Sequence, residues 1–321
     1  MTVPSTDPEP LRAFAQALAG KDPKTINAYR SVIRDLIAWL ATRPGGDPFR
    51  LNLLTETALR GYMQHLEAIN RAPRTRSKAL SAIRRFCRWA VDTGQLPRNP
   101  AYQLERPTVE MLSPKELSDD QRYVLKNLVE RQESPRLSAI FALGYWSGLR
   151  ISEVAALRFD HCVINQRAGT ITVVGAKGSK TRTLDLHNRA RRALLAYLQL
   201  PVTESQAREP DSLYVFTSQR AAWHRQQNRP DHLSARGAAH LWTRLKAQAT
   251  HEEWQFIQDI TFHDLRHDWA HRARASGWSL EEIAAYAGHQ TKDGAPAIQT
   301  TVRYTLPSRQ QIKEKLQTLQ G

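Results

Sequence analysis

The segment ERPTVEMLSPKELS, residues 105–118, constrains the fold of this chain more than any other feature of the sequence. Its prolines interrupt regular structure between two long stretches of helical periodicity, which is typical of an interdomain linker. A chain of 321 residues is also too long for one small hydrophobic core. We therefore expect a flexible tail at 1–10, one domain at 11–105, a linker at 106–117 and a second domain at 118–321.

The first of these domains has the pattern of a small helical bundle. Apolar side chains recur at helical spacing in 24–42, and a second helical stretch, 54–68, begins beside Thr55, a favourable N-cap. A third stretch, 74–94, carries an apolar face and ends at Gly94, a common helix stop. These signals predict an all-helical domain.

The second domain combines helices with a hairpin. Residues 138–159 predict two helices separated by a break at Ser147 and Gly148. The stretch GTITVVGAKGSKTRTLDL, residues 169–186, is β-branched on both sides of a turn rich in glycine and lysine, which predicts a β-hairpin. Helical periodicity returns at 188–200 and continues toward the end. The expected fold class is mainly α with a small antiparallel β-sheet in the C-terminal domain.

The charge balance narrows the class of partner. Lysine and arginine number 46 against 31 aspartates and glutamates, a formal charge of +15. A surplus of this size attracts polyanions, so nucleic acid is the first expected partner and a membrane surface the second. Apolar runs fall short of the ~18 residues that a membrane span requires. Cys87 and Cys162 are too few for a disulfide framework or a cysteine zinc site, which favours the cytoplasm.

A basic run in the first domain is the first candidate contact with nucleic acid. Residues 71–91 contain no acidic side chain. Arg84 and Arg88 stand one helical turn apart, opposite the apolar face, where they could follow a phosphate backbone. A solvated surface is the alternative, and the overall charge favours DNA. The candidate DNA-binding residues are Arg71, Arg74, Arg76, Lys78, Arg84, Arg85 and Arg88.

Two further candidates lie near the predicted hairpin. Arg150 follows Gly148 where a helix begins, so its guanidinium could meet an anion, and Glu153, one turn later, could orient it. A surface salt bridge is the alternative interpretation. The hairpin turn carries Lys177 between two glycines, which matters only where a site needs a proton donor.

The stretch FHDLRHDWAHRARASG, residues 262–277, concentrates three histidines and three arginines. His263 and Arg266 share a helix face, and His267 joins them at spacing four. The arginine could bind a phosphate bidentately while the histidine donates or transfers a proton. The same histidine spacing is also found in zinc sites. The motif lacks an interposed glutamate and a third ligand, so we expect no metal.

The last candidates are a histidine and a tyrosine near the C-terminal end. Gly288 is expected to end a helix and expose the imidazole of His289. Tyr304 follows in a polar, basic setting, where nearby cations would lower the pKa of a phenol and make it a nucleophile. The alternative is a packed tyrosine with a hydrogen-bonded hydroxyl. Tyr286 is the rival nucleophile, but it lies on an apolar helix face, which indicates packing.

In chain order these motifs resemble the tyrosine recombinase/integrase family of DNA strand-exchange enzymes, from about residue 10 to about 310. SGLRISEVAALRF resembles the first arginine motif, KGSKTRTLDL the β-hairpin motif, HDLRH the His-x-x-Arg box and TTVRYT the nucleophile motif, while AGH supplies a histidine. The patterns KTINAYRSVIRDLIAWL, RTRSKALSAIRRF and RNPA are similar to the family's helical core-binding domain. The catalytic residues that the resemblance implies are Arg150, Lys177 rather than Lys180, His263, Arg266, His289 and Tyr304, with Glu153 in support.

The resemblance also implies an activity and partners. A SAM-like core-binding domain at 11–105 and a catalytic domain at 118–321 would form a two-domain clamp on double-stranded DNA with a specific core site. Tyr304 would form a 3′-phosphotyrosine without metal or cofactor, for integration, excision or resolution of DNA molecules. Four protomers would act on two duplexes, as a homotetramer or a heterotetramer with a paralogue. Accessory DNA-bending proteins would be further partners, a membrane would not be a partner, and the protein would lie in the cytoplasm with the nucleoid.

Other activities are compatible with parts of this pattern. A type IB topoisomerase-like enzyme would use the same chemistry as a monomer, and a non-catalytic DNA-binding protein could share the scaffold. A metal-dependent nuclease is a third alternative.

The sequence departs from the family pattern in two places. The turn has Gly-Ala-Lys-Gly where Gly-Lys-Gly is more usual, and His289 and Tyr304 are separated by an apparent added loop, TKDGAPAIQ at 291–299.

Overall fold

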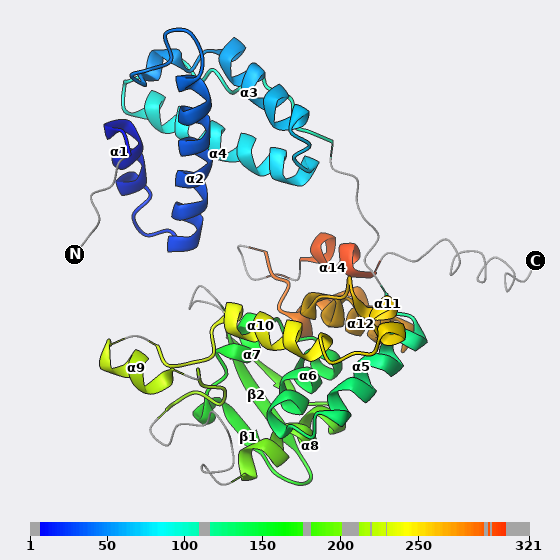
Figure 1. Cartoon of the computed structure of the whole chain (residues 1–321). Coiled ribbons are helices and arrows are strands. Elements are labelled where there is room, and N and C mark those ends of the chain that lie inside the picture. Colours follow the sequence, from blue (N-terminus) through cyan, green and yellow to red (C-terminus); the bar gives the residue numbers. More distant parts are fainter. Residues whose placement is uncertain are drawn as a thin grey trace, which may run out of the picture. The chain divides into compact units, whose positions relative to one another are not determined.

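The computed structural model describes residues 7–108, 116–175, 181–200, 212–218, 220–228, 230–291, 295 and 297–305. The chain divides into two compact units, 1–111 and 112–321 (Figure 1). It is mainly helical, and a three-stranded antiparallel sheet lies in the second unit. The predicted fold class is therefore confirmed.

The first unit is a bundle of helices. Its regular elements are α1 (Glu9–Ala17), α2 (Pro23–Ala41), the 3₁₀ helix η1 (Leu51–Leu53), α3 (Glu56–Ala68) and α4 (Pro73–Asp92). All three predicted helices are present, and the hydroxyl of Thr55 accepts a hydrogen bond from the amide of Ala58, as expected of an N-cap.

The first unit, in which α2 crosses α4 (Figure 1), has aromatic rings from α1 and α4 in its hydrophobic core. Phe14 meets Phe86 edge to face with ring centroids 5.0 Å apart, and Phe86 stacks on Trp89 at 5.5 Å. Cys87 is fully buried in the same core. The unit thus has a core of its own.

The start of the described chain differs from the expected tail. α1 begins at Glu9, and the carboxylate of Asp7 is buried between Arg30, at 2.5 Å, and Arg34, at 2.8 Å. Burial opposes ionisation, but hydrogen bonds from both arginines hold the pKa of Asp7 below its usual value. The predicted flexible tail therefore does not hold for residues 7–10.

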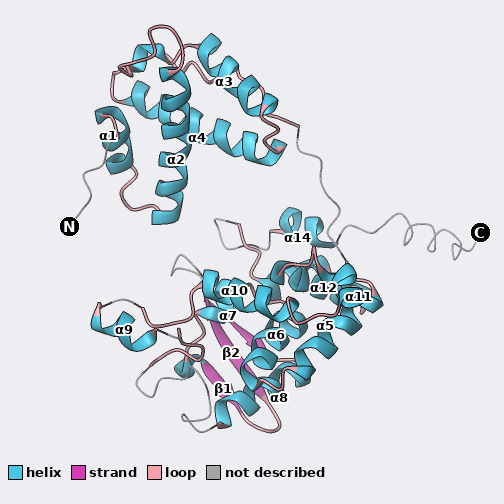
Figure 2. Ribbon diagram, viewed as in Figure 1, coloured by secondary structure: helices cyan, strands magenta, loops and turns pink. Residues whose placement is uncertain are grey.

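The second unit packs helices around a small sheet, drawn in magenta in Figure 2. Its elements are α5 (Asp119–Arg131), α6 (Pro135–Ser147), α7 (Ile151–Ala155), η2 (Phe159–His161), β1 (Cys162–Ile164), β2 (Gly169–Val174), β3 (Thr181–Asp185), α8 (Asn188–Gln199), α9 (Ala221–Gln226), α10 (Ala235–Lys246), α11 (His251–Ile257), α12 (Phe262–Ala275), α13 (Leu280–Ala287) and α14 (Ile298–Thr305).

The sheet has the order β1-β2-β3, and every neighbouring pair is antiparallel. The predicted hairpin is β2 and β3, with Ile171 opposite Leu184, both buried. β1 was not predicted, because three residues are too few to show alternation.

α6 is the central helix of the second unit. Residues 139–145 are buried on every side of it, and it packs against α8 and α12. Ser134 caps its first turn, and Gly148 ends it in the left-handed conformation. The break predicted at Ser147 and Gly148 is confirmed.

A buried carboxylate fastens the beginning of the second unit to α12. Asp268 accepts from Arg122 Nη2 at 2.8 Å, from Arg272 Nε at 2.8 Å and from the amide of Leu117 at 3.3 Å. Leu117 is itself part of the core, although we expected it in the linker. The last linker residue is thus held by a buried, fully paired carboxylate.

Candidate active site

The candidate site begins where α6 ends. Gly148 has φ 60°, and a Cβ placed there would lie 2.5 Å from Cε3 of Trp269, so only glycine fits this turn. The turn carries the chain directly into α7, with Arg150 as the residue before its first turn. The arginine predicted to meet an anion therefore lies at the junction of α6 and α7.

Glu153 is the carboxylate around which the arginines gather. Its oxygens accept from the amide and Nη1 of Arg150, both at 2.9 Å, and from Nη1 and Nη2 of Arg182 at 3.0 and 3.1 Å. Nη1 of Arg266 lies 3.9 Å away. Burial would raise the pKa of Glu153, but hydrogen bonds and charge from Arg182 lead the opposing effects and lower it to about 2.

Arg266 is buried to 1% exposure and is held by the ends of two helices. Its Nη1 donates to the carbonyl of Gly148 at 2.5 Å, and its Nη2 donates to the carbonyl of Ala287 at 2.6 Å. These carbonyls close α6 and α13, where the helix dipole is negative and carbonyls lack helical partners. Two helix C-termini and Glu153 therefore compensate this buried cation.

His289 leaves α13 through a second left-handed glycine, Gly288, with φ 68°. The predicted helix end is confirmed, but the imidazole is 3% exposed rather than open to solvent. Its Nε2 lies 2.9 Å from Nη2 of Arg266, and its Nδ1 lies 3.0 Å from Oγ1 of Thr301. Because a guanidinium only donates, Nε2 accepts and Nδ1 carries the proton. Burial lowers the pKa of His289 to about 3, so the ring is neutral.

His263 and His267 lie on the first turns of α12, with ring centroids 4.7 Å apart. Burial, followed by the charge of Arg266, lowers the pKa of His263, and burial lowers that of His267 to about 4. Both rings are therefore neutral near pH 7. Within the described ranges, no group of three or more histidine, cysteine, aspartate or glutamate side chains is placed to hold a metal ion.

The structure does not describe the side chains of two predicted catalytic residues, Lys177 and Tyr304. Lys177 and its rival Lys180 lie outside the described residues. Tyr304 lies in α14, three residues after Thr301, but the structure describes only its backbone. α14 already starts at Ile298, so the last two residues of the predicted added loop are helical.

The rival tyrosine is a packed side chain. The ring of Tyr286 stacks on Trp269 with centroids 5.1 Å apart, and its hydroxyl donates to the carbonyl of Asp185 at 2.8 Å. Burial raises its pKa, which is the opposite of what an attacking phenolate needs. The packing interpretation of Tyr286 agrees with these contacts.

Arg182 and Thr301, for which the sequence predicted no role, both contact candidate residues. Arg182 occupies the same face of β3 as buried Leu184, and a charged residue at an inward position requires a partner. That alternation was a usable signal. Thr301 lies one turn before Tyr304, but nothing in the sequence pairs its hydroxyl with His289.

The basic side chains of the first unit fall into two groups. Arg71, Arg74, Lys78, Arg85 and Arg88 are exposed. Arg76 is half-buried and pairs with Glu67 at 2.5 Å, and Arg84 is half-buried as well. The exposed group is available to a polyanion, whereas the other two already have partners in the fold.

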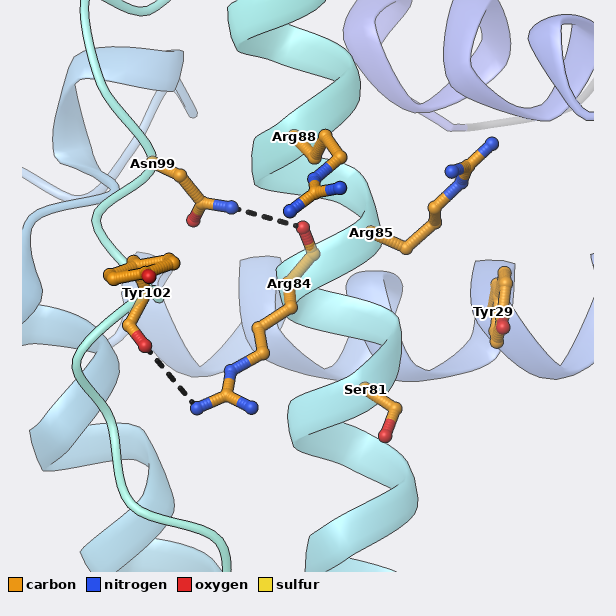
Figure 3. A pocket seen from close by; sticks show the side chains of 7 residues that line it. All are labelled: Tyr29, Ser81, Arg84, Arg85, Arg88, Asn99 and Tyr102. Atoms are coloured by element: carbon orange, nitrogen blue, oxygen red, sulfur yellow. Dashed lines mark hydrogen bonds between the residues drawn. The ribbon is translucent and has the colours of Figure 1, made fainter.

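Arg84 faces the segment that follows α4 (Figure 3). Its Nε donates to the carbonyl of Ala101 at 3.1 Å, and its Nη2 donates to those of Tyr102, at 3.4 Å, and Leu104. It lines a pocket of about 350 Å³ whose other residues are Tyr29, Ser81, Arg85, Arg88, Asn99 and Tyr102. Arg84 thus fixes the wall of a basic pocket rather than projecting from it.

No helix in the described ranges is both long and apolar enough to cross a bilayer.

Comparison with known proteins gives consistent matches along the chain. The phage integrase family model matches residues 116–310, and the phage integrase N-terminal SAM-like domain matches residues 11–94. Tyrosine recombinase XerC of Myxococcus xanthus is 29% identical over 316 residues, covering 95% of this chain and 94% of the relative. XerC of Pseudomonas savastanoi pv. phaseolicola is 31% identical over 285 residues, covering 88% and 85%.

Solved structures share the fold at low sequence identity. The Tn1549 transposon integrase in complex with transposon right end DNA has a TM-score of 0.71 at 15% identity, covering 96% of this chain and 98% of that one. A lambda integrase tetramer bound to a Holliday junction has a TM-score of 0.65 at 15% identity, covering 91% and 76%. Because the family model spans more than half of the sequence, this chain belongs to the phage integrase family, the tyrosine recombinases that bind, break and rejoin DNA strands.

Proposed function

We propose that this recombinase cuts DNA by attack of Tyr304 on one backbone phosphorus. The observation that carries the proposal is the convergence of Arg150 and Arg266 on Glu153, where α6 and α13 end. Two guanidinium groups held this way can neutralise the nonbridging oxygens and the charge that grows on them in the transition state. α14, which carries Tyr304, is joined to the same cluster by Thr301 and His289.

In the proposed reaction every bond formed replaces a bond broken, and side chains of the protein transfer the protons, so no external cofactor is needed. The Oη of Tyr304 forms a bond to phosphorus while the bond from phosphorus to the 5′ oxygen breaks, which leaves a 3′-phosphotyrosine. His263, neutral at pH 7, accepts the phenol proton, and Lys177 donates a proton to the departing oxygen. A 5′ hydroxyl from another strand reverses the steps and rejoins DNA in a new arrangement.

His289 has a narrower role in this proposal than the sequence suggested. In the free protein its Nε2 accepts from Arg266, so it orients that guanidinium. Donation to a phosphate oxygen would require the ring to exchange this bond for one made by a protonated Nε2.

We further propose how the two units divide the work. Residues 11–105 would form the core-binding domain and 118–321 the catalytic domain of a clamp on a specific double-stranded core site. Arg71 and the exposed basic residues of α4 would contact phosphates, with Arg76 and Arg84 supporting the helix. Four protomers, identical or shared with a paralogue, would act on two duplexes in the cytoplasm, with accessory DNA-bending proteins.

The test is covalent trapping on a nicked suicide substrate that contains the target site. We expect a protein–DNA adduct with wild type and with Tyr286→Phe, and none with Tyr304→Phe, because only the latter removes the attacking oxygen. EDTA should leave the yield unchanged. An adduct that persists in Tyr304→Phe would refute the assignment, and relaxation of a supercoiled plasmid without a target site would favour the topoisomerase-like alternative.

A further inference from the structure

Arg182 is a charged side chain on the inner face of the sheet. It lies on β3 opposite Val173 of β2, which is buried, and only 13% of its own side chain is exposed. Burial of a guanidinium is costly unless its donors are satisfied. Its partners therefore show what the fold uses it for.

Those partners connect three elements. Nη1 and Nη2 of Arg182 bind the two oxygens of Glu153 on α7 at 3.0 and 3.1 Å, a bidentate pair. Its Nε donates to the carbonyl of Tyr286 on α13 at 2.9 Å. Arg182 therefore links β3 to α7, which begins directly after Arg150, and to α13, which ends just before His289.

The close fit around Gly288 points the same way. A Cβ at position 288 would lie 2.7 Å from Nη1 of Arg182, so the guanidinium rests against the backbone of the turn before His289. Arg182 therefore contacts Glu153, which lies near Arg266, and also the turn that precedes His289.

The charges explain why a third arginine is useful here. Arg150, Arg182 and Arg266 surround the single carboxylate of Glu153, so three positive charges and one negative charge leave a formal +2. Without Arg182, Glu153 would be shared by Arg150 and Arg266 alone and would draw their guanidinium groups toward itself. Arg182 occupies both carboxylate oxygens, which leaves Arg150 oriented but not neutralised.

We propose that Arg182 is a positioning residue for strand cleavage, which holds Glu153 so that Arg150 and Arg266 keep their charge and direction for the phosphate. This inference rests on the proposed function above. Arg182 itself acts through Glu153 and the end of α13, not on the reacting atoms.

The experiment compares Arg182→Met and Arg182→Lys in the full chain. Single-turnover cleavage of the suicide substrate at saturating DNA should fall about 100-fold in Arg182→Met, the scale of a misplaced catalytic group. Arg182→Lys should recover part of the rate, because it keeps the charge but loses the bidentate geometry. The DNA dissociation constant should change less than about threefold. Arg192→Met, which removes an exposed arginine of α8, is the matched control and should cleave like wild type.

A methylphosphonate at the scissile position distinguishes positioning from a general structural effect. This substitution removes the negative charge of the phosphate, so cleavage depends less on well-placed guanidinium groups. The deficit of Arg182→Met relative to wild type should shrink at least about tenfold on this substrate. An equal deficit on both substrates, or cleavage by Arg182→Met within about threefold of wild type, would overturn the inference.

Misfolding of Arg182→Met and failure of the proposed function can each be distinguished from failure of this inference. If Arg182→Met does not fold, by circular dichroism and urea unfolding, the same comparison is made with Arg182→Lys, whose deficit must also shrink on the methylphosphonate. If wild type and Arg192→Met form no adduct on either substrate, the proposed function fails, and with it the basis of this inference.

Discussion

At the scale of single residues, the central feature is a buried cation whose charge is balanced mainly by backbone. Arg266 is held by the carbonyls of Gly148 and Ala287 and by the ring of His289. Neutral dipoles stabilise a guanidinium without cancelling its net charge. The site can therefore keep a cation out of water and still present positive charge to a phosphate.

The neutral state of His289 predicts how stability depends on pH. Its pKa is about 3 in the folded protein, against about 6.5 in an unfolded chain. Between these values the unfolded state binds one more proton, so stability is greatest above pH 6.5 and falls as pH decreases, by up to about 1.4 kcal/mol per pH unit. We expect urea unfolding midpoints to decrease from pH 7.5 to pH 5.

His289→Gln should flatten that pH dependence, because an amide can accept from Arg266 and donate to Thr301 without titrating. Some slope should remain, because the pKa of His267 is also lowered, to about 4. His240→Gln, which removes an exposed histidine of α10, controls for the loss of any imidazole. A slope in His289→Gln as steep as in wild type would contradict the assignment of a neutral, buried ring.

At the scale of elements, the hydroxyl of Thr301 connects α14 to the arginine cluster through His289. Thr301 is fully buried, and its Oγ1 accepts a hydrogen bond from Nδ1–H of His289, whose Nε2 accepts one from Arg266. The position of the helix that bears Tyr304 and the orientation of Arg266 are therefore linked through a single imidazole. This linkage makes a direct prediction for Thr301.

Thr301→Val should slow strand cleavage while Thr301→Ser should not. Valine keeps the shape but leaves a buried N–H of His289 without its acceptor, which costs about 1–3 kcal/mol. We expect at least about a tenfold lower single-turnover rate, with DNA affinity unchanged. Thr300→Val, at the exposed neighbouring position of α14, is the control. Equal rates for both valine variants would show that the hydroxyl does not act through His289.

The elements that the sequence predicted are those whose signals are local. The helices 24–42, 54–68 and 74–94 show their apolar stripes within the segment, and glycine marks the ends of α6 and α13. α1 and β1 were missed, because nine and three residues give little periodicity. Partners separated along the chain cannot be seen locally: Arg182 meets Glu153 across 29 positions and Tyr286 across 104.

For the candidate site residues, too, the sequence predicted local motifs but not the contacts made by the fold. The motifs around Arg150, Arg266 and His289 were recognisable, and the structure brings these side chains together. Their environment was not predictable, because burial depends on the whole fold. His289 was expected to be exposed and is buried, and Arg84 was expected to face a phosphate and instead binds carbonyls of the chain.

At the scale of the whole molecule, the described residues of each unit form a hydrophobic core, and the two cores share none of these residues. One core contains Phe14, Ile83 and Phe86, and the other contains Leu125, Leu143 and Phe262. A unit with a complete core needs no neighbour to bury its apolar surface. The two units should therefore be independent in stability.

Residues 1–111 and 112–321, produced separately, should each unfold cooperatively in urea, with midpoints close to those of the intact protein. Fragments 112–165 and 166–321 provide the control, because that cut divides the second core and should prevent folding. Loss of cooperativity in either of the first two fragments would show that the units depend on each other. Circular dichroism and tryptophan fluorescence report both transitions.

Separate interiors also bear on how such an enzyme changes over time. Side chains beneath α4 and side chains around Glu153 belong to different compact units, each with its own hydrophobic cluster. On the proposed division of roles, the DNA contacts of the first unit can therefore change in evolution while the proposed catalytic residues of the second unit stay the same. An engineer seeking a retargeted enzyme should graft the first unit whole, and leave the ends of α6 and α13 alone.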